Sequence, residues 1–296
     1  MIEQKNLESL RCGDKSLQHA DLKQADLRGS DLSGADLSRA DLSQADLTGA
    51  NLAGAILTRV NFKQTNLCYA NLQDAELLWA NFADADLRGA NLQTANLRLV
   101  SFKRTLIDDK TQMDDKWRLV WRLINKGGEA LDLRGVDLSH TDLDGVKLPK
   151  ADLSKANLFA ADINHADLND ANFERAYLEG CNFVCSNLQG ASLKGSYLED
   201  SHLIESDLTG ASFDDADLSN ALILNVKLLG ATLQRTTLTG ATIQPADWAM
   251  NATEQLKDIV CDFVYVNKQR RPCDPSLNFD EGELALRLSL GILGEA

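Results

Sequence analysis

The chain has 296 residues, of which 44% are hydrophobic but only 6% aromatic, so any buried core must be built mainly from aliphatic side chains. Its formal net charge of -14 argues against direct binding to nucleic acid or to an anionic membrane and favours a basic protein partner. No apolar run approaches the length of about 18 residues that a membrane span needs, and the first residues carry charges throughout. We therefore expect no transmembrane segment and no signal peptide, and we expect the six cysteines to be reduced thiols in a cytoplasmic protein.

A five-residue repeat dominates the sequence. Each cell has a small residue, an Asp or Asn, a central Leu, Ile or Phe, and two polar residues, as in ADLRGSDLSGADLSR. Centres recur at every fifth position from Leu17 to Phe102, which makes 18 cells, and again from Leu133 to Ile243, which makes 23. This period fits neither an α-helix nor a plain strand. It predicts a coil in which the centre and the small residue two positions before it point inward, while the other three positions face solvent.

The bulky centres indicate how many cells form one coil. Four sides of one cell each would close a square coil, and a residue and its counterpart four cells later would then be neighbours in adjacent coils. The phenylalanine centres follow this spacing: Phe62, Phe82 and Phe102 share one column of the first run, Phe183 shares a column with three isoleucines of the second run, and Phe173 and Phe213 share the opposite column. We therefore expect stacked ladders of Leu and Phe inside, with coils about 4.8 Å apart.

With these repeats the chain resembles the pentapeptide-repeat family over most of its length, and cyanobacterial members in particular. The resemblance implies an all-β solenoid of right-handed quadrilateral β-helices, and it says little about function, although some members act in cell differentiation. We expect two such arrays with an α-helical insertion and a C-terminal cap. The expected segments are a first array at 1–106, a helical linker or plug at 107–130, a second array at 131–248 and a capping segment at 249–296.

The frame slips by one residue between the arrays, because the interval from Phe102 to Leu133 is one residue longer than six cells. Within this interval TQMDDKWRLVWRLINKGG predicts a helix with Asp114 or Asp115 as its N-cap and glycines past its end. Its apolar residues fall at helical spacing: Trp117, Val120, Trp121 and Ile124.

This helix has an apolar surface to contact in the first array. The cells centred on 57, 77 and 97 share one side whose outward positions turn apolar: Ile56, Leu78, Trp79 and Leu99. We expect the helix to fold back over this side or to cap the adjacent coil end, since solenoid ends need covers. An exposed recognition helix is the alternative.

The repeat is absent from Asn251 onward. DIVCDFVYV (258–266) alternates as a strand does, and a charged turn, NKQRRP, follows it. The closing stretch fits a helix through Leu284, Leu288 and Ile292 or a strand through its alternating leucines, and we favour the helix. We expect this tail to dock on the apolar outer side of the second array, or else that side serves a homodimer or another partner.

The sequence shows no arrangement typical of catalysis. A regular solenoid is convex, and the chain lacks H-x-x-x-H, C-x-x-C, G-x-S-x-G and phosphate-binding glycine motifs. Cys185 and His202 share a side in adjacent coils, but Cys181 points inward, so we expect no metal site. The row of aspartates from Asp21 onward is interpreted as turn residues that bond their own backbone. We expect no catalytic, cofactor-binding or metal-binding residues and no enzymatic activity.

The expected function is that of a β-helical scaffold that presents acidic and apolar side surfaces to a protein partner of unknown identity. The second array carries a net charge of -10 against -1 for the first, and its acids are spread over all four sides without a dominant stripe. The candidate contact residues combine stacked tyrosines, acids and apolar side chains: Tyr177, Tyr197, Asp214, Asp215, Asp217, Ile204, Leu222 and Leu224.

Nucleic-acid mimicry is the alternative function. The resemblance implies it, because some family members modulate DNA gyrase by presenting a duplex-like acidic rod. The second array would form a rod of roughly 29 Å, and duplex DNA of that length carries about 17 charges. The net charge of -10 is only somewhat more than half of that value, and the first array is too close to neutral for mimicry.

Overall fold

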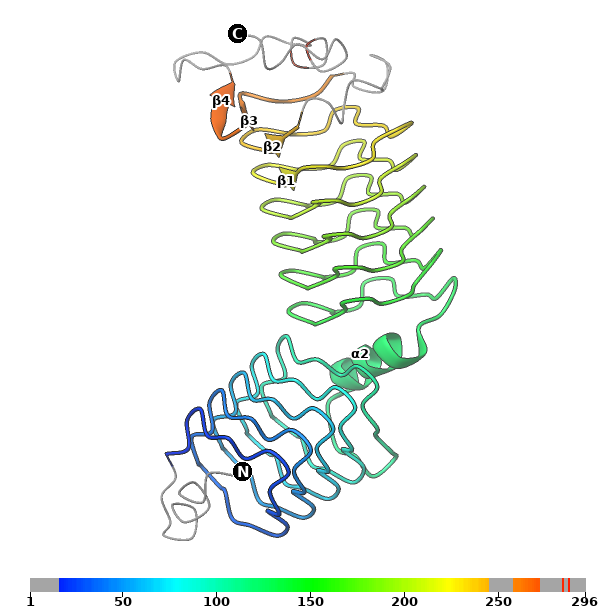
Figure 1. Ribbon diagram of the computed structural model, residues 1–296. Helices are drawn as coiled ribbons and strands as arrows, with labels where there is room; N and C mark the ends of the chain where they lie inside the picture. Colours follow the sequence, from blue (N-terminus) through cyan, green and yellow to red (C-terminus); the bar gives the residue numbers. More distant parts are fainter. Residues whose placement is uncertain (1–15, 245–257, 272–283, 285–286, 288–296) are drawn as a thin grey trace. The chain divides into compact units, whose positions relative to one another are not determined.

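The computed structural model describes residues 16–244 and 258–271 together with residues 284 and 287. The chain forms two compact units, Met1–Lys126 and Gly127–Ala296, which are described separately below (Figure 1). Both contain a stack of coils. The elements delimited within the described residues are the helix α2 (Asp115–Lys126) and the short strands β1 (Leu222–Ile223), β2 (Thr242–Ile243), β3 (Val264–Val266) and β4 (Gln269–Arg271). Among the described residues, no helix has the length and apolar character needed to cross a membrane.

Successive coils are linked by parallel β-bridges between residues four cells apart, such as Asp21 with Asp41 and Asp137 with Asn157. Within the repeats, the bridges lie at the residue before a centre. The amide of Leu22 donates to the carbonyl of Asp41 at 2.8 Å, and the amide of Asp41 donates to the carbonyl of Ala20 at 2.9 Å. The predicted coil of four five-residue cells is therefore confirmed in both units.

The aspartates and asparagines before the centres shape the turns between the sides. Their side chains accept hydrogen bonds from the backbone two residues later, as when the amide of Ser33 donates to Asp31 at 3.1 Å. Two residues after the centre the backbone turns left-handed, with φ near 60° at residues such as Gln24 and Arg39 and at several glycines. Amide side chains also bond from coil to coil, and Asn71 donates to Asn51 at 3.2 Å. The turn interpretation of the aspartate row is thus confirmed.

The core of each stack consists of the centres and the small residues two positions before them, which are almost fully buried. The rings of Phe62 and Phe82 stack with centroids 4.9 Å apart, and those of Phe82 and Phe102 at 6.1 Å. In the second unit Phe173, Phe183 and Phe213 are buried, and the first two meet edge to face across the core at 6.3 Å. The predicted phenylalanine columns are therefore confirmed.

The frame slip is taken up at the last turn of the first unit. Asn91 pairs with Gln112, one position beyond the residue that four cells would reach. Asp108 occupies the extra turn and accepts hydrogen bonds from the amides of Gly89 and Thr111, both at 2.9 Å. One inserted residue is thus absorbed without breaking the stack.

Helix α2 caps the end of this first stack, which confirms one of the two predicted placements. It buries Trp117, Val120 and Leu123. The prediction of Trp117 and Val120 is confirmed, but the third buried residue is Leu123 and not Trp121 or Ile124. The Trp121 indole still donates to the carbonyl of Thr105 at 2.7 Å. Trp79 remains 45% exposed, so the helix does not cover the apolar side of the stack.

The described part of the tail adds a further coil to the end of the second unit. Val260 pairs with Thr237, β3 pairs in parallel with β2, and β4 returns antiparallel to β3 (Figure 1). Residues 258–271 therefore stack on the coil end, and the expectation that they dock on the apolar outer side is wrong for this segment. The reason is the unpaired backbone of the last coil, which β3 satisfies.

The expected strand at 258–266 is found as β3 and the bridge at Val260, but the charged turn is shorter than predicted. Only Asn267 and Lys268 form it, with φ of 50° and 65°, and the residues after them form β4. Helical structure is found at Leu284, which is buried, and at Arg287. The rest of the predicted closing helix lies outside the described residues.

Candidate interaction surface

The outward side chains of the second unit fall on four sides, each named here after one of its residues. The Arg175 side has its centres at Leu133, Leu153, Phe173, Leu193, Phe213 and Leu233. Continuing along the coil, the Tyr177 side has Leu138, Leu158, Leu178, Leu198, Leu218 and Leu238, and the Val184 side has Leu143, Ile163, Phe183, Leu203, Ile223 and Ile243. The Lys147 side has Leu148, Leu168, Leu188, Leu208 and Leu228.

Charge is divided unequally among these sides. All lysines and arginines of residues 131–244 lie on two of them: Arg134, Lys155, Arg175, Lys194 and Arg235 on the Arg175 side, and Lys147, Lys150 and Lys227 on the Lys147 side. The two remaining sides are adjacent and carry nine acids with no lysine or arginine: Asp137, Glu179, Glu199, Asp200 and Asp217 on the Tyr177 side, and Asp142, Asp144, Asp162 and Glu205 on the Val184 side. The acids are spread over all four sides as expected, and it is the distribution of lysines and arginines that distinguishes two of the sides.

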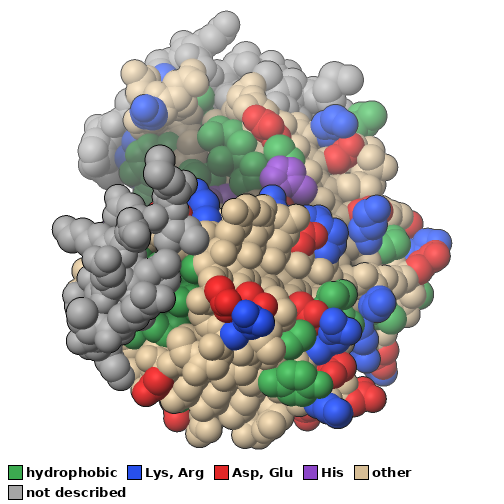
Figure 2. All heavy atoms as spheres, turned by 60° about the horizontal axis from the view of Figure 1, so that its bottom comes forward, with side chains coloured by type: hydrophobic (Ala, Val, Ile, Leu, Met, Phe, Trp, Pro, Cys, Tyr) green, Lys and Arg blue, Asp and Glu red, His purple; other side chains and the backbone are tan. Residues whose placement is uncertain are grey.

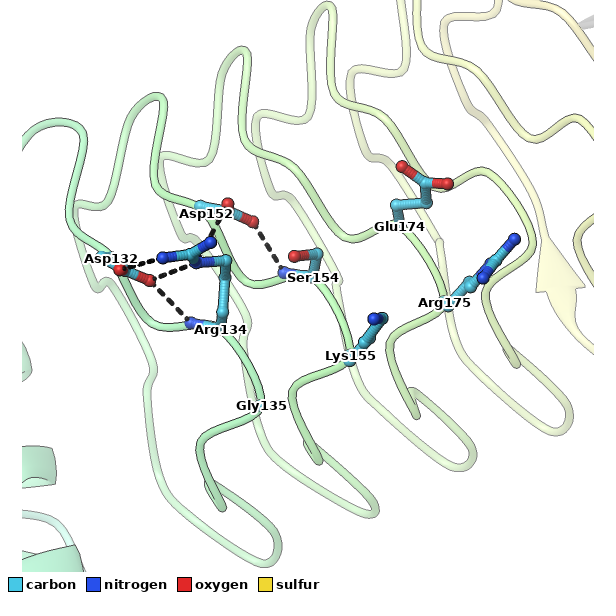
Figure 3. A pocket seen from close by; sticks show the side chains of 8 residues that line it. All are labelled: Asp132, Arg134, Gly135, Asp152, Ser154, Lys155, Glu174 and Arg175. Carbon is cyan, nitrogen blue, oxygen red and sulfur yellow. Dashed lines mark hydrogen bonds and ion pairs between the residues drawn. The ribbon is translucent and has the colours of Figure 1, made fainter.

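On the Arg175 side the acids are neutralised locally. Arg134 lies between two carboxylates, with Nη2 at 2.7 Å from Asp132 and Nε at 3.7 Å from Asp152 (Figure 3). The hydrogen bond from Arg134 lowers the pKa of Asp132 to about 2. Asp215 is similarly bonded by Arg235 at 2.6 Å. This side therefore presents alternating charges with little net field.

The Tyr177 side contains a groove that runs between two rows of side chains. Tyr177 and Tyr197 form one wall, with their rings stacked at 5.2 Å and 11° between planes. Phe159, Glu179 and Glu199 lie along the other wall, and His140 meets the Phe159 ring edge to face at 5.2 Å. The two tyrosines are 53% and 45% exposed. An aromatic, acidic and open surface results.

One carboxylate of the groove is partly withdrawn from solvent. Oε2 of Glu199 is buried and has no hydrogen-bond partner among the described residues. Burial is the main cause that raises the pKa of Glu199, and the negative charges of Asp217, Glu179 and Asp200 raise it further. The groove is therefore a site of uncompensated negative potential.

The Val184 side combines half-buried apolar residues with acids. Ile204, Leu222 and Leu224 are each partly exposed along it. Cys185 donates to Glu205 at 3.4 Å, and this carboxylate raises the pKa of the thiol. Within the described ranges no three His, Cys, Asp or Glu side chains are grouped as a metal site would require.

The predicted contact residues do not lie on one surface. Tyr177, Tyr197 and Asp217 share the Tyr177 side, whereas Ile204, Leu222 and Leu224 lie on the Val184 side. Asp214 and Asp215 lie on the Arg175 side, where Asp215 has a basic partner. Sequence reasoning missed Phe159, Glu179 and Glu199, although their four-cell spacing places them in one column beside the tyrosines.

The first unit distributes its charges differently, with acids and bases intermixed (Figure 2). Its ion pairs join residues within a cell or between neighbouring coils, such as Arg28 with Asp26 at 2.6 Å and Arg104 with Asp84. Its exposed aromatic residues are single, and the ring of Tyr69 lies directly over the backbone of Gly89. No described surface of this unit combines stacked aromatic rings with a purely acidic side.

Comparisons with known proteins agree with this architecture. A family model described as "Pentapeptide repeat region" matches residues 35–111, and a second, "Pentapeptide repeats (8 copies)", matches residues 16–49, 130–158, 156–195 and 186–223. A search of curated proteins finds no significant match.

Several solved structures are similar to the chain. HetL from the cyanobacterium Nostoc, a pentapeptide repeat protein involved in heterocyst differentiation regulation, is 28% identical, with 80% of this chain and 97% of that chain covered and a TM-score of 0.29. Another Nostoc pentapeptide repeat protein, alr5209, is 32% identical over 38% of this chain and 95% of its own, with a TM-score of 0.25. QnrB1, a plasmid-mediated fluoroquinolone resistance protein, is 15% identical over 66% of this chain and 88% of its own, with a TM-score of 0.23. The family models cover well over half of the sequence, and the chain belongs to the pentapeptide repeat family.

Proposed function

We propose that this protein is a non-catalytic interaction scaffold whose second unit binds a basic protein through the Tyr177 and Val184 sides. The family resemblance implies that the scaffold itself consists of right-handed quadrilateral β-helices. One observation carries the proposal, namely that nine acids and no lysine or arginine occupy these two adjacent sides. Such a field attracts a cationic surface over several ångströms and rejects an anionic one. The proposed location is the cytoplasm, where a buried thiol such as Cys181 stays reduced.

Apolar and aromatic groups on the same two sides support a protein partner over free cations. Tyr177 and Tyr197 offer rigid, amphipathic contact area, and Leu222 and Leu224 offer apolar area close by. Interfaces combine such central groups with a charged rim. The opposite sides of the same unit lack this combination, so they serve as internal controls.

The test is capture of partners from the native cell extract with two matched variants. The first variant removes three negative charges from the Tyr177 side with Glu179→Gln, Glu199→Gln and Asp217→Asn. The second removes the same number from the Arg175 side with Asp152→Asn, Glu174→Gln and Asp214→Asn. Asparagine occupies the position before the centre in many cells and the position after it at Asn164 and Asn169, so the coils tolerate it at both. The proposal predicts basic partners that are lost with the first variant and retained with the second. Retention by both variants would contradict it.

A second candidate function is mimicry of nucleic acid toward a DNA-binding protein, which the same charge division favours. Over a stack of roughly 29 Å, nine acids on two sides compare with about eight phosphates on one DNA strand of that length. A supercoiling assay with DNA gyrase tests the version suggested by the family. Inhibition or protection that disappears in the first variant supports mimicry, and no effect at micromolar protein removes it.

A further inference from the structure

The groove on the Tyr177 side has the features of a receptor for a single cationic side chain. Its two walls, the stacked tyrosines and the row of Phe159, Glu179 and Glu199, run along the same direction as the stack. Aromatic ring faces attract cations, and carboxylates at the wall supply acceptors. No lysine or arginine of this side competes for those acceptors.

The Glu199 carboxylate favours a ligand that donates hydrogen bonds. Glu199 lines the groove, and burial holds one of its oxygens out of water without a hydrogen-bond partner among the described residues. A carboxylate that is partly withdrawn from water gains more from a charged donor than a fully hydrated one does. A ligand that brings N–H donors to this carboxylate would compensate the negative potential that it shares with Glu179 and Asp217.

We infer that the groove binds an arginine side chain from an extended segment of the partner protein. Guanidinium is planar, stacks against tyrosine and phenylalanine rings, and donates two parallel hydrogen bonds to one carboxylate. Its three-carbon stem lies against apolar surface while the charged head reaches the acids. Lysine is a compact, strongly hydrated charge with no plane to stack, so it uses this geometry less well.

This inference rests on the proposed function, because an arginine receptor has a role only if a basic protein is the partner. It adds the residue type that is recognised and the groove that binds it. The proposed function and the arginine receptor can be tested separately. The extract experiment reports on whole acidic sides, whereas binding of one short peptide reports on the groove alone.

The experiment uses the full chain with carbon-13 label on its four tyrosine rings and follows their NMR signals. The probe is an acetylated and amidated pentapeptide with one central arginine between glycines. We expect a saturable shift of the Tyr177 and Tyr197 signals with Tyr69 and Tyr265 unchanged. The citrulline peptide, which keeps the shape and loses the charge, is expected to bind at least tenfold more weakly, and the lysine peptide at least threefold more weakly.

Three variants locate the binding site. Glu199→Gln is expected to weaken arginine-peptide binding at least fivefold, and the double variant Tyr177→Ser, Tyr197→Ser at least tenfold. Serine occupies the equivalent slot at Ser192 and Ser212, so the coil accepts it. Glu174→Gln on the Arg175 side is the control and is expected to change binding less than twofold.

Several results would overturn the inference: no saturable tyrosine shift, equal binding of the citrulline or lysine peptide, or unchanged binding by Glu199→Gln. A tyrosine shift that depends on protein concentration without any peptide would show that a second copy of the chain occupies the groove, which also overturns it. If the peptide fails while the extract partners are still lost with the Tyr177-side variant, the proposed function stands and the arginine receptor does not.

Discussion

The two units are built from the same five-residue cell but differ in how their outer positions are used. In the first unit, bases lie close to acids, as in the pairs of Lys23 with Asp41 and Arg88 with Asp86. In the second unit, lysines and arginines occupy two sides, and the other two carry acids and three histidines, of which His165 contacts Asp144 at 2.7 Å. Because the inward positions form the core and the Asp or Asn before each centre forms the turn, the remaining outward positions are freer to vary. The fold is therefore shared, and the charge pattern distinguishes what each unit can bind.

The units also differ in how their core rings are placed. Phe82 contacts a stacked ring on each side, whereas Phe183 stands between Ile163 and Leu203 in its column. We expect Phe82→Ala to lower the free energy of unfolding by about 3–5 kcal/mol. Tryptophan fluorescence during urea unfolding reports mainly on the first unit, which contains Trp79, Trp117 and Trp121.

Conservative changes sharpen this contrast between the cores. Phe82→Leu loses two stacked ring contacts and Phe183→Leu loses one edge contact, so we expect the first to cost more. Circular dichroism follows both variants, because it reports on the backbone of both units alike. A larger loss for Phe183→Leu would break the proposed difference between the cores.

Substitutions in α2, which caps the first stack, are expected to change the free energy of unfolding less than those in the phenylalanine core. Leu123 of α2 is fully buried against the last coil of the first unit, whereas Leu119 is only half-buried. We expect Leu123→Ala to cost about 2–4 kcal/mol and Leu119→Ala much less, because only the former leaves a cavity under the cap. Hydrogen exchange of the amides near Thr105 and Gln112 provides the local readout. Equal effects of the two substitutions would show that α2 does not cap the coil through this face.

The smallest expected change in the free energy of unfolding comes from Asp207, a carboxylate on the Lys147 side. Burial alone would raise the pKa of Asp207, but hydrogen bonds from Lys227, Thr209 and Gln189 outweigh it and lower the pKa to about 2. We expect Asp207→Asn to cost roughly 1 kcal/mol at neutral pH.

The pH dependence of this effect has a defined sign. The folded pKa lies below the unfolded value of 3.8, so the stabilisation is present above about pH 4 and is lost as pH falls toward 2. The difference between the wild type and Asp207→Asn should shrink over that range in urea titrations. Asp167→Asn, in the same column and next to Asn187, is the control, and its stability difference from the wild type is not expected to change with pH. A difference that grows on acidification would contradict the assignment.

The sequence predicted the parts of the fold that depend on spacing. The four-cell coil, the phenylalanine columns and the helix near Trp117 all follow from periodicity, which inward-facing positions must obey. The buried face of α2 was less predictable, because Leu123 and Ile124 both fit the helical stripe. A C-terminal cap with a strand was predicted, but its docking on the outer side was wrong, because alternation within 258–266 cannot show which backbone the strand pairs with.

The candidate surface was predictable only in part. The stacking of Tyr177 on Tyr197 followed from the four-cell spacing, and the same rule applied to lysines and arginines would have shown that two sides lack them. The burial of one oxygen of Glu199 depends on how neighbouring side chains pack, which no spacing rule gives. Asp215 was placed among the contact residues although Arg235, four cells later, is its neighbour in the next coil.

Photo-crosslinking in the native cell tests the central claim, that the acidic sides of the second unit make the contact, most directly. A photoreactive phenylalanine analogue replaces Phe159 on the Tyr177 side or Ser154 on the Arg175 side, which occupy the same slot in neighbouring cells. The account predicts crosslinks from position 159 to a basic, arginine-containing segment and none from position 154. Crosslinks from position 154 alone, or from 159 to an acidic segment, would contradict it.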